Sequence, residues 1–134
     1  MQFFNKLKPL ALLLLRAAIG VIFIYHGYPK LFGQAQRYVE FYTQAGLPGY
    51  FSYISGVLEL FGGSLLIGGL FTRIAGLLLA VEMAVAIWKI HLNEGVLSVG
   101  EYQFPLAMAV GAFALAAHGA GLISLDYLIY REKA

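Results

Sequence analysis

Residues 54–92 read ISGVLELFGGSLLIGGLFTRIAGLLLAVEMAVAIWKIHL. Two apolar runs lie here, at 54–71 and 74–92, and only Thr72 and Arg73 separate them. Each run is close to the ~20 residues that a helix needs to cross about 30 Å of hydrocarbon. The stretch therefore predicts two antiparallel membrane-spanning helices joined by a tight turn, with the glycine pair before the turn ending the first helix and Thr72 capping the second.

Two further apolar runs of similar length flank this hairpin, at 10–28 and 104–123. The first has no small-residue cleavage site, which favours a retained span over a secretory signal. Residues 34–44 mix aromatic and charged side chains and predict a short interfacial helix. The predicted fold class is all-α, an antiparallel four-helix transmembrane bundle formed by a single domain, residues 1–134.

The composition agrees with a membrane location. Hydrophobic residues make up 60% of the chain and charged residues 12%, against about 25% charged residues in soluble domains. The formal net charge of +2 comes from scattered basic residues and gives no reason to expect a nucleic-acid partner. The absence of cysteine excludes disulfides and thiolate-bound metals within the chain, so any electron transfer would require a bound cofactor.

The distribution of basic residues predicts an orientation. One face, shared by both termini and the short turn, carries Lys6, Lys8, Arg73, Arg131 and Lys133. The other face has fewer basic residues, and most of the tyrosines gather toward it. The positive-inside rule therefore places both termini in the cytoplasm.

Ionisable residues inside the apolar runs are the strongest indication of function. A charge at the centre of a membrane helix costs at least about 2.5–3.5 kcal/mol, so such residues are expected to face one another or a polar cavity. With a rise of about 1.5 Å per residue, Arg16 and Glu82 fall at matching depths. We predict that these two side chains form a structural ion pair, with His118 near the same level.

A second group of polar residues lies nearer the outer face and is the predicted ligand-binding site: His26, Lys30, Glu59, Lys89, His91 and Glu101. A quinone would suit such a place, because aromatic rings can stack on it, His or Lys can donate to its oxygens, and titratable groups can supply protons. His26 and His91 make a bis-histidine haem conceivable, but the chain has no haem-attachment motif. We expect neither haem nor metal.

Glycines recur at heptad spacing, which predicts close helix packing. Gly20 and Gly27 share one face of the first span, and Gly56 and Gly63 share one face of the second. Small residues at such positions allow the backbones of membrane helices to approach each other. The same glycine-rich faces would permit a homo-oligomer.

Several short motifs occur in a fixed order: HGYPKLFG at 26–33, GLP at 46–48, LELFGG at 58–63, TR at 72–73, EYQFPL at 101–106 and SLD at 124–126. Together they resemble the DoxX family of small four-helix membrane proteins. Members of that family are described as membrane subunits of oxidoreductase systems, including a thiosulfate:quinone oxidoreductase, and many have no assigned reaction. The resemblance implies a bacterial cytoplasmic (inner) membrane and importance for Arg16, His26, Lys30, Glu59, Arg73 and Glu101.

The leading hypothesis is an integral membrane subunit of an oxidoreductase system that binds a quinone or similar lipophilic ligand in a polar intramembrane cavity. The expected partners are the lipid bilayer, subunits of that oxidoreductase and further copies of the chain. Two alternatives stay open: a non-catalytic scaffold or assembly protein, and a small lipid or proton-coupled transporter. The sequence assigns no catalytic residue and leaves open whether the chain is an enzyme.

Overall fold

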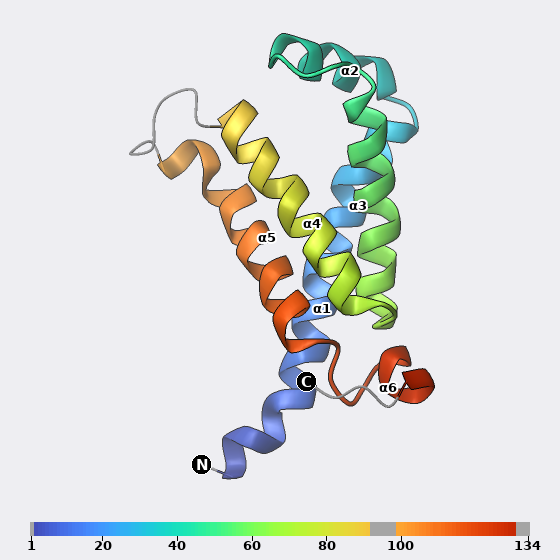
Figure 1. Cartoon of the computed structure of the whole chain (residues 1–134), viewed down its shortest axis with the longest axis vertical. Coiled ribbons are helices and arrows are strands. Elements are labelled where there is room, and N and C mark those ends of the chain that lie inside the picture. Colours follow the sequence, from blue (N-terminus) through green and yellow to red (C-terminus); the bar gives the residue numbers. More distant parts are fainter. Residues whose placement is uncertain (1, 92–98, 131–134) are drawn as a thin grey trace.

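The computed structural model describes residues 2–91 and 99–130, all of whose regular structure is helical. Figure 1 shows the long helices running lengthwise, with α2 lying across one end and α6 near the other. The elements in chain order are α1 (Gln2–Leu31), α2 (Ala35–Gln44), α3 (Phe51–Gly68), α4 (Thr72–Ala86), the π-helical segment η1 (Ile87–His91), α5 (Val99–His118) and α6 (Leu125–Tyr130).

The all-helical fold class is confirmed for the described residues. Helices α1 and α3 are each long and apolar enough to cross a membrane. Helix α5 contains a shorter apolar stretch, Gln103–His118. The predicted helix at 34–44 is also present, as α2, and its place at a membrane interface stays a prediction.

Helices α1 and α3 pack through the heptad-spaced glycines, as the sequence predicts. A Cβ atom at Gly20 would lie 2.6 Å from the carbonyl oxygen of Gly63, and a Cβ atom at Gly63 would lie 2.6 Å from the carbonyl oxygen of Gly20. One heptad further along, a Cβ atom at Gly27 would lie 2.8 Å from Glu59 Cβ. The two backbones come this close because a glycine on one or both helices leaves each contact without a second side chain.

Gly63→Ala is expected to lower the free energy of unfolding by about 1–3 kcal/mol, because the added methyl group meets backbone that cannot move aside easily. Gly68→Ala on the same helix is the matched control, since its nearest neighbour would be Leu125 Cδ1 at an ordinary 3.6 Å. Denaturant titrations in detergent micelles check both variants. Equal stability of the two would show that the α1–α3 contact is looser than it is here.

The other half of the molecule packs in the same way. A Cβ atom at Gly76 in α4 would lie 2.7 Å from the carbonyl oxygen of Ala112 in α5. Between the two helix pairs lies an apolar core of buried side chains from α1, α3, α4 and α5: Ile19, Phe23, Leu66, Ala75, Leu79, Ala80, Met108, Ala112 and Leu115.

The turn between α3 and α4 is tight, as predicted, but it is capped differently. Gly69 ends α3 in the left-handed conformation, with φ +70°. Thr72 is not the cap of α4: it is the first residue of that helix, and Phe71 precedes it. The oxygens of Asp126 accept from the backbone N–H groups of Phe71 (2.7 Å) and Thr72 (2.9 Å) instead. A carboxylate there satisfies free donors and interacts favourably with the helix dipole.

The predicted last span, 104–123, is too long at its carboxyl end. Helix α5 ends at His118, because Gly119 adopts a left-handed conformation with φ +78°. The chain then turns and forms α6 beside the α3–α4 turn, where the backbone N–H of Asp126 donates to the carbonyl oxygen of Gly69 at 2.8 Å. Helix α6 ends at Tyr130, and 131–134 lie outside the described residues.

Candidate functional site

The side chain of Lys30 is the centre of a buried polar cluster. Lys30 lies near the end of α1, and its exposed fraction is only 8%. Its Nζ donates to Glu59 Oε1 at 2.8 Å, to Ser55 Oγ at 2.8 Å and to Tyr42 Oη at 3.0 Å. An ammonium group has three N–H donors, so every donor of Lys30 is already used.

Ser55 joins Lys30 to a second carboxyl group, that of Glu82. The hydroxyl oxygen of Ser55 accepts from Lys30 and, at 3.1 Å, from Tyr42, and its proton is donated to Glu82 Oε1. These bonds use both lone pairs and the proton of the hydroxyl. The five residues Lys30, Tyr42, Ser55, Glu59 and Glu82 are termed the Lys30 cluster, and they come from α1, α2, α3 and α4.

Local geometry explains why the cluster assembles. Ser55 and Glu59 lie one helical turn apart, so they share one face of α3. A Cβ atom at Gly56 would lie 3.0 Å from Lys30 Cβ, and one at Gly27 would lie 2.8 Å from Glu59 Cβ. Since these glycines have no side chains, the end of α1 lies close enough to α3 for the ion pair to form.

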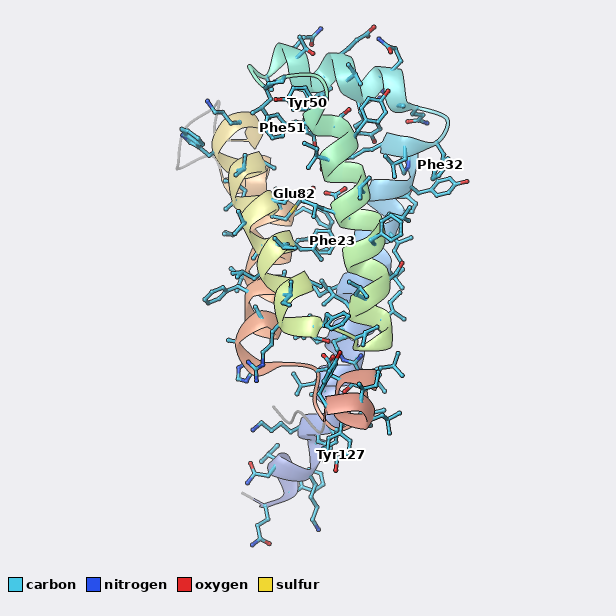
Figure 2. All side chains as sticks on the ribbon, turned by 45° about the vertical axis from the view of Figure 1, so that its right-hand side comes forward. Phe23, Phe32, Tyr50, Phe51, Glu82 and Tyr127 are labelled. Atoms are coloured by element: carbon cyan, nitrogen blue, oxygen red, sulfur yellow. The ribbon has the colours of Figure 1, made fainter. Side chains whose placement is uncertain are left out.

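The Oε2 atom of Glu82 is buried and has no hydrogen-bond partner within residues 2–91 and 99–130. It is the one carboxyl oxygen of the cluster in this position. Figure 2 shows Glu82 on the inner side of α4, facing α3 and lying above Phe23. The cluster thus gathers one ammonium group and two carboxyl groups away from solvent. An unbalanced charge in such a place is costly.

A cavity of about 220 Å³, termed cavity 1, adjoins the cluster. Its polar lining comes from His26, Lys30, Tyr38, Tyr42 and Glu59, and its apolar lining from Phe23, Phe41, Met83, Ala86, Phe104, Pro105 and Met108. The His26 ring lies 5.1 Å from the Phe104 ring, centroid to centroid. None of the described hydrogen bonds uses the ring nitrogens of His26 or the hydroxyl of Tyr38. These two side chains are therefore available to a ligand.

A second cavity, cavity 2, has a volume of about 190 Å³ and lies mainly between α3 and α4. Its apolar lining includes Phe51, Leu58, Leu78 and Val85, and its polar lining comes from Tyr42, Ser55 and Glu82. Figure 2 places Phe51 and Glu82 at the same end of the molecule. The Lys30 cluster lies between the two cavities, with Glu59 lining cavity 1 and Glu82 lining cavity 2.

The structure brings together three of the six predicted ligand-binding residues, since His26, Lys30 and Glu59 all line cavity 1. Lys89 does not line it. Its Nζ lies over the Trp88 ring instead, 4.3 Å from the ring centroid. The side chains of His91 and Glu101 lie outside the described residues. Ligand binding by the three gathered residues stays a prediction.

The predicted ion pair between Arg16 and Glu82 is wrong. The buried guanidinium of Arg16 donates to the carbonyl oxygens of Leu66 (3.1 Å), Ile67 (3.3 Å) and Ile123. It therefore binds carbonyl groups at the carboxyl end of α3 and in the segment before α6. The side chain of His118 is exposed at the end of α5, and its predicted depth near Arg16 stays a prediction.

The error arises from the depth at which the spans begin. The sequence-based prediction places residues 10 and 74 at the same depth in the membrane. In the structure α1 begins at Gln2, and the side chain of Arg16 reaches only the end of α3. Glu82 lies about 15 Å along α4 from its first residue, by a rise of about 1.5 Å per residue. The two side chains consequently serve different ends of the molecule.

Two members of the cluster were not among the predicted site residues. Ser55 could have been found, because it lies one turn before Glu59 on the same helix face. Tyr42 could not, since its position depends on how α2 folds back over α1 and α3. In the part of the chain that the structure describes, no three His, Cys, Asp or Glu side chains form a group that could hold a metal ion.

The fold and the site define a class of protein: an all-helical membrane protein with a buried ion pair beside a largely apolar cavity. The chain belongs to the DoxX family, because the family model DoxX matches residues 11–92. No solved structure matches the chain significantly.

The relatives cover nearly the whole chain. CatD of Bacillus subtilis (strain 168), named a proposed oxidoreductase, is 33% identical over 129 residues, which cover 96% of this chain and 94% of CatD. The inner membrane protein YqjF of Escherichia coli (strain K12) is 30% identical over 132 residues, covering 96% of this chain and 98% of YqjF. A membrane protein of Mycobacterium tuberculosis is 28% identical over 131 residues, covering 88% of this chain and 80% of that protein.

Proposed function

We propose that this protein is the membrane subunit of an oxidoreductase system and that cavity 1 binds the head group of a quinone or a comparable lipophilic molecule. The observation that carries the proposal is the lining of cavity 1, where an aromatic and aliphatic wall meets a few polar groups. Ligand sites in proteins have this composition. The name of the relative CatD supports the oxidoreductase class.

The available groups fit an oxygen-bearing aromatic ring. His26 can donate a ring N–H to a ligand oxygen, and the neighbouring Phe104 offers a face or edge for stacking. Tyr38 offers a hydroxyl. Lys30 fits less well as a direct donor than the sequence indicates, because all three of its protons are bonded within the cluster. A bound quinone would supply the exchange of electrons at this site.

The size of cavity 1 suits a head group and not a whole lipid. Its volume of about 220 Å³ is below the roughly 300–1,000 Å³ of pockets that enclose drug-sized ligands. A hydrocarbon tail would therefore extend from the cavity along the exposed apolar surface into the bilayer.

The membrane arrangement is part of the proposal. Besides α1 and α3, α4 has 15 residues and η1 adds 5, which together reach the ~20 residues of a spanning helix. Helix α5 would be the fourth span. In this arrangement both termini are cytoplasmic, and α2 with the two cavities lies toward the outer face of a bacterial inner membrane, the location named for YqjF.

The test is the extraction of bound lipophilic molecules from protein purified in native-lipid particles, followed by mass spectrometry. A stoichiometric quinone is expected in the wild type. His26→Ala should retain about tenfold less, since one lost hydrogen bond of about 1–1.5 kcal/mol corresponds to about that factor. His118→Ala is the matched control, because His118 is exposed at the end of α5, away from cavity 1. Bulk lipid alone in all three samples would refute the proposal.

A non-catalytic scaffold is the second candidate. The observation in its favour is that the three donors of Lys30 bind α2 and α3, and that Arg16 binds the end of α3 and the segment before α6, as purely structural clasps would. For a scaffold, changes at His26 should leave partner binding and stability unchanged, whereas changes at Lys30 should reduce both. Co-purification of partner subunits with each variant distinguishes the two functions.

A further inference from the structure

The Lys30 cluster forms an unbroken chain of hydrogen bonds between the two cavities. Starting at cavity 1, the chain runs from Glu59 to Lys30 (2.8 Å), from Lys30 to Ser55 (2.8 Å) and from Ser55 to Glu82, which lines cavity 2. Each link is a donor bonded directly to an acceptor, with no gap that a water molecule must bridge. Such a chain has the geometry that proton transfer requires.

Charge counting shows how many protons the chain holds. Lys30 carries one positive charge, so two ionised carboxyl groups would leave a net negative charge in a buried place, which is costly. One ammonium, one carboxylate and one carboxylic acid together are neutral. The carboxylate is Glu59 in the arrangement observed here, since Lys30 Nζ contacts it directly. The acid is then Glu82, whose Oε2 has no donor to stabilise a negative charge.

The other titratable groups that face the Lys30 cluster do not change this count of protons and charges. From α1 the nearest other titratable group is His26, and from α2 it is Tyr38, both of which line cavity 1. Helix α5 contributes only Phe104, Pro105 and Met108 among its described residues. None of these groups adds a charge that would balance a second carboxylate when His26 is neutral.

We propose that Glu59 and Glu82 share one proton and exchange it through Lys30 and Ser55, so that cavity 2 is the proton-exchange side of the ligand site in cavity 1. Starting from the protonation state assigned above, Lys30 passes a proton to Glu59, Ser55 passes its proton to Lys30, and Glu82 passes its proton to Ser55, so that Glu59 becomes the acid and Glu82 the carboxylate. Lys30 and Ser55 end as they began. Only O–H and N–H bonds change, and no electron is transferred.

The inference rests on the proposed function only for the use of the proton, because the shared proton itself needs no bound ligand. Infrared spectra of the full chain in lipid nanodiscs, recorded in H₂O and D₂O near neutral pH, test it through the C=O band of a protonated carboxyl group. The wild type should show one such buried band that shifts in D₂O. Glu82→Gln should abolish the band.

Glu59→Gln distinguishes a shared proton from an isolated acid. In that variant Glu82 is the only carboxyl group left to balance Lys30, so it should ionise and the band should again be lost. Glu40→Gln is the control, because Glu40 is exposed on α2, and it should keep the band. Absence of the band from the wild type, or its survival in Glu59→Gln, would overturn the proposal.

Ser55→Ala keeps all three titratable groups and removes the link between Lys30 and Glu82. The band should persist at a shifted position and exchange with D₂O more slowly than in the wild type, whereas unchanged exchange would count against Ser55 as the link. Near-native thermal unfolding of each variant shows that the fold is intact. A band without extractable quinone would reject the proposed function alone, and quinone without the band would reject the shared proton alone.

Discussion

Lys30→Met is expected to lower the free energy of unfolding by about 3–5 kcal/mol near neutral pH, because it leaves the buried carboxylate of Glu59 without its partner. Tyr42 and Ser55 each also lose the hydrogen bond that Lys30 donates to them. Denaturant titrations in mixed micelles near neutral pH measure the loss.

A second substitution in the same background separates charge from packing. Lys30→Met combined with Glu59→Gln removes both charges and should recover part of the lost stability, as double-mutant cycles of contacting pairs show. Lys6→Met is the control, because Lys6 is an exposed residue of the same helix. A loss at Lys30 no larger than at Lys6 would mean that the ion pair is solvated and the cluster is not a sealed unit.

Arg16→Met is the second change with a large expected effect, a loss of about 3 kcal/mol or more. The carbonyl oxygens of Ile67 and Ile123 lose the Arg16 donor, that of Leu66 keeps only the backbone N–H of Gly69, and each acceptor left unpaired costs about 1–3 kcal/mol. Arg16→Lys should recover little of this, because a single ammonium cannot reproduce the planar fork of donors that reaches all three oxygens.

The same denaturant titrations check this variant, with Arg37→Met as the control. Arg37 is exposed on α2 and should tolerate the change. Quinone content measured on the folded fraction of Arg16→Met should equal that of the wild type, since Arg16 does not line either cavity. A loss of ligand without a loss of stability would show that Arg16 belongs to the binding site after all.

These expectations assign different roles to the two groups of buried charge. Arg16 and Asp126 lie at the end of the molecule where α3 meets α4, and they satisfy backbone groups at helix ends. The Lys30 cluster lies toward α2, beside both cavities, and most of its bonds join one side chain to another. Only the second arrangement places titratable groups where a ligand could reach them.

Periodicity in the sequence was enough to predict the long helices and a close-packing face on two of them. The apolar runs predicted the helices, and heptad spacing predicted a glycine face on each of the first two spans; that these two faces meet is a finding of the structure. His26, Lys30 and Glu59 were also gathered correctly. Helix rise preserves their order along the membrane normal, so residues near the same end of adjacent helices can be expected to meet.

The partners of the buried charges could not be read in the same way. The Arg16–Glu82 prediction failed because the level at which each helix begins is set by packing, and α1 extends beyond the start of α4. The cap of α4 was assigned to the adjacent Thr72, although Asp126, distant in sequence, provides it. A shift of one or two turns exchanges one partner for another without altering the hydrophobic pattern.

By itself the sequence determined an all-helical chain rich in apolar runs, the family to which it belongs and the polar residues available inside it, since these depend on composition and local spacing. The tertiary structure alone decided that Lys30 binds Glu59, that Ser55 connects Lys30 to Glu82, and that Tyr42 closes the cluster from α2. Hydrogen bonds form over about 3 Å, a tolerance far finer than the helix register that a hydrophobic pattern can specify.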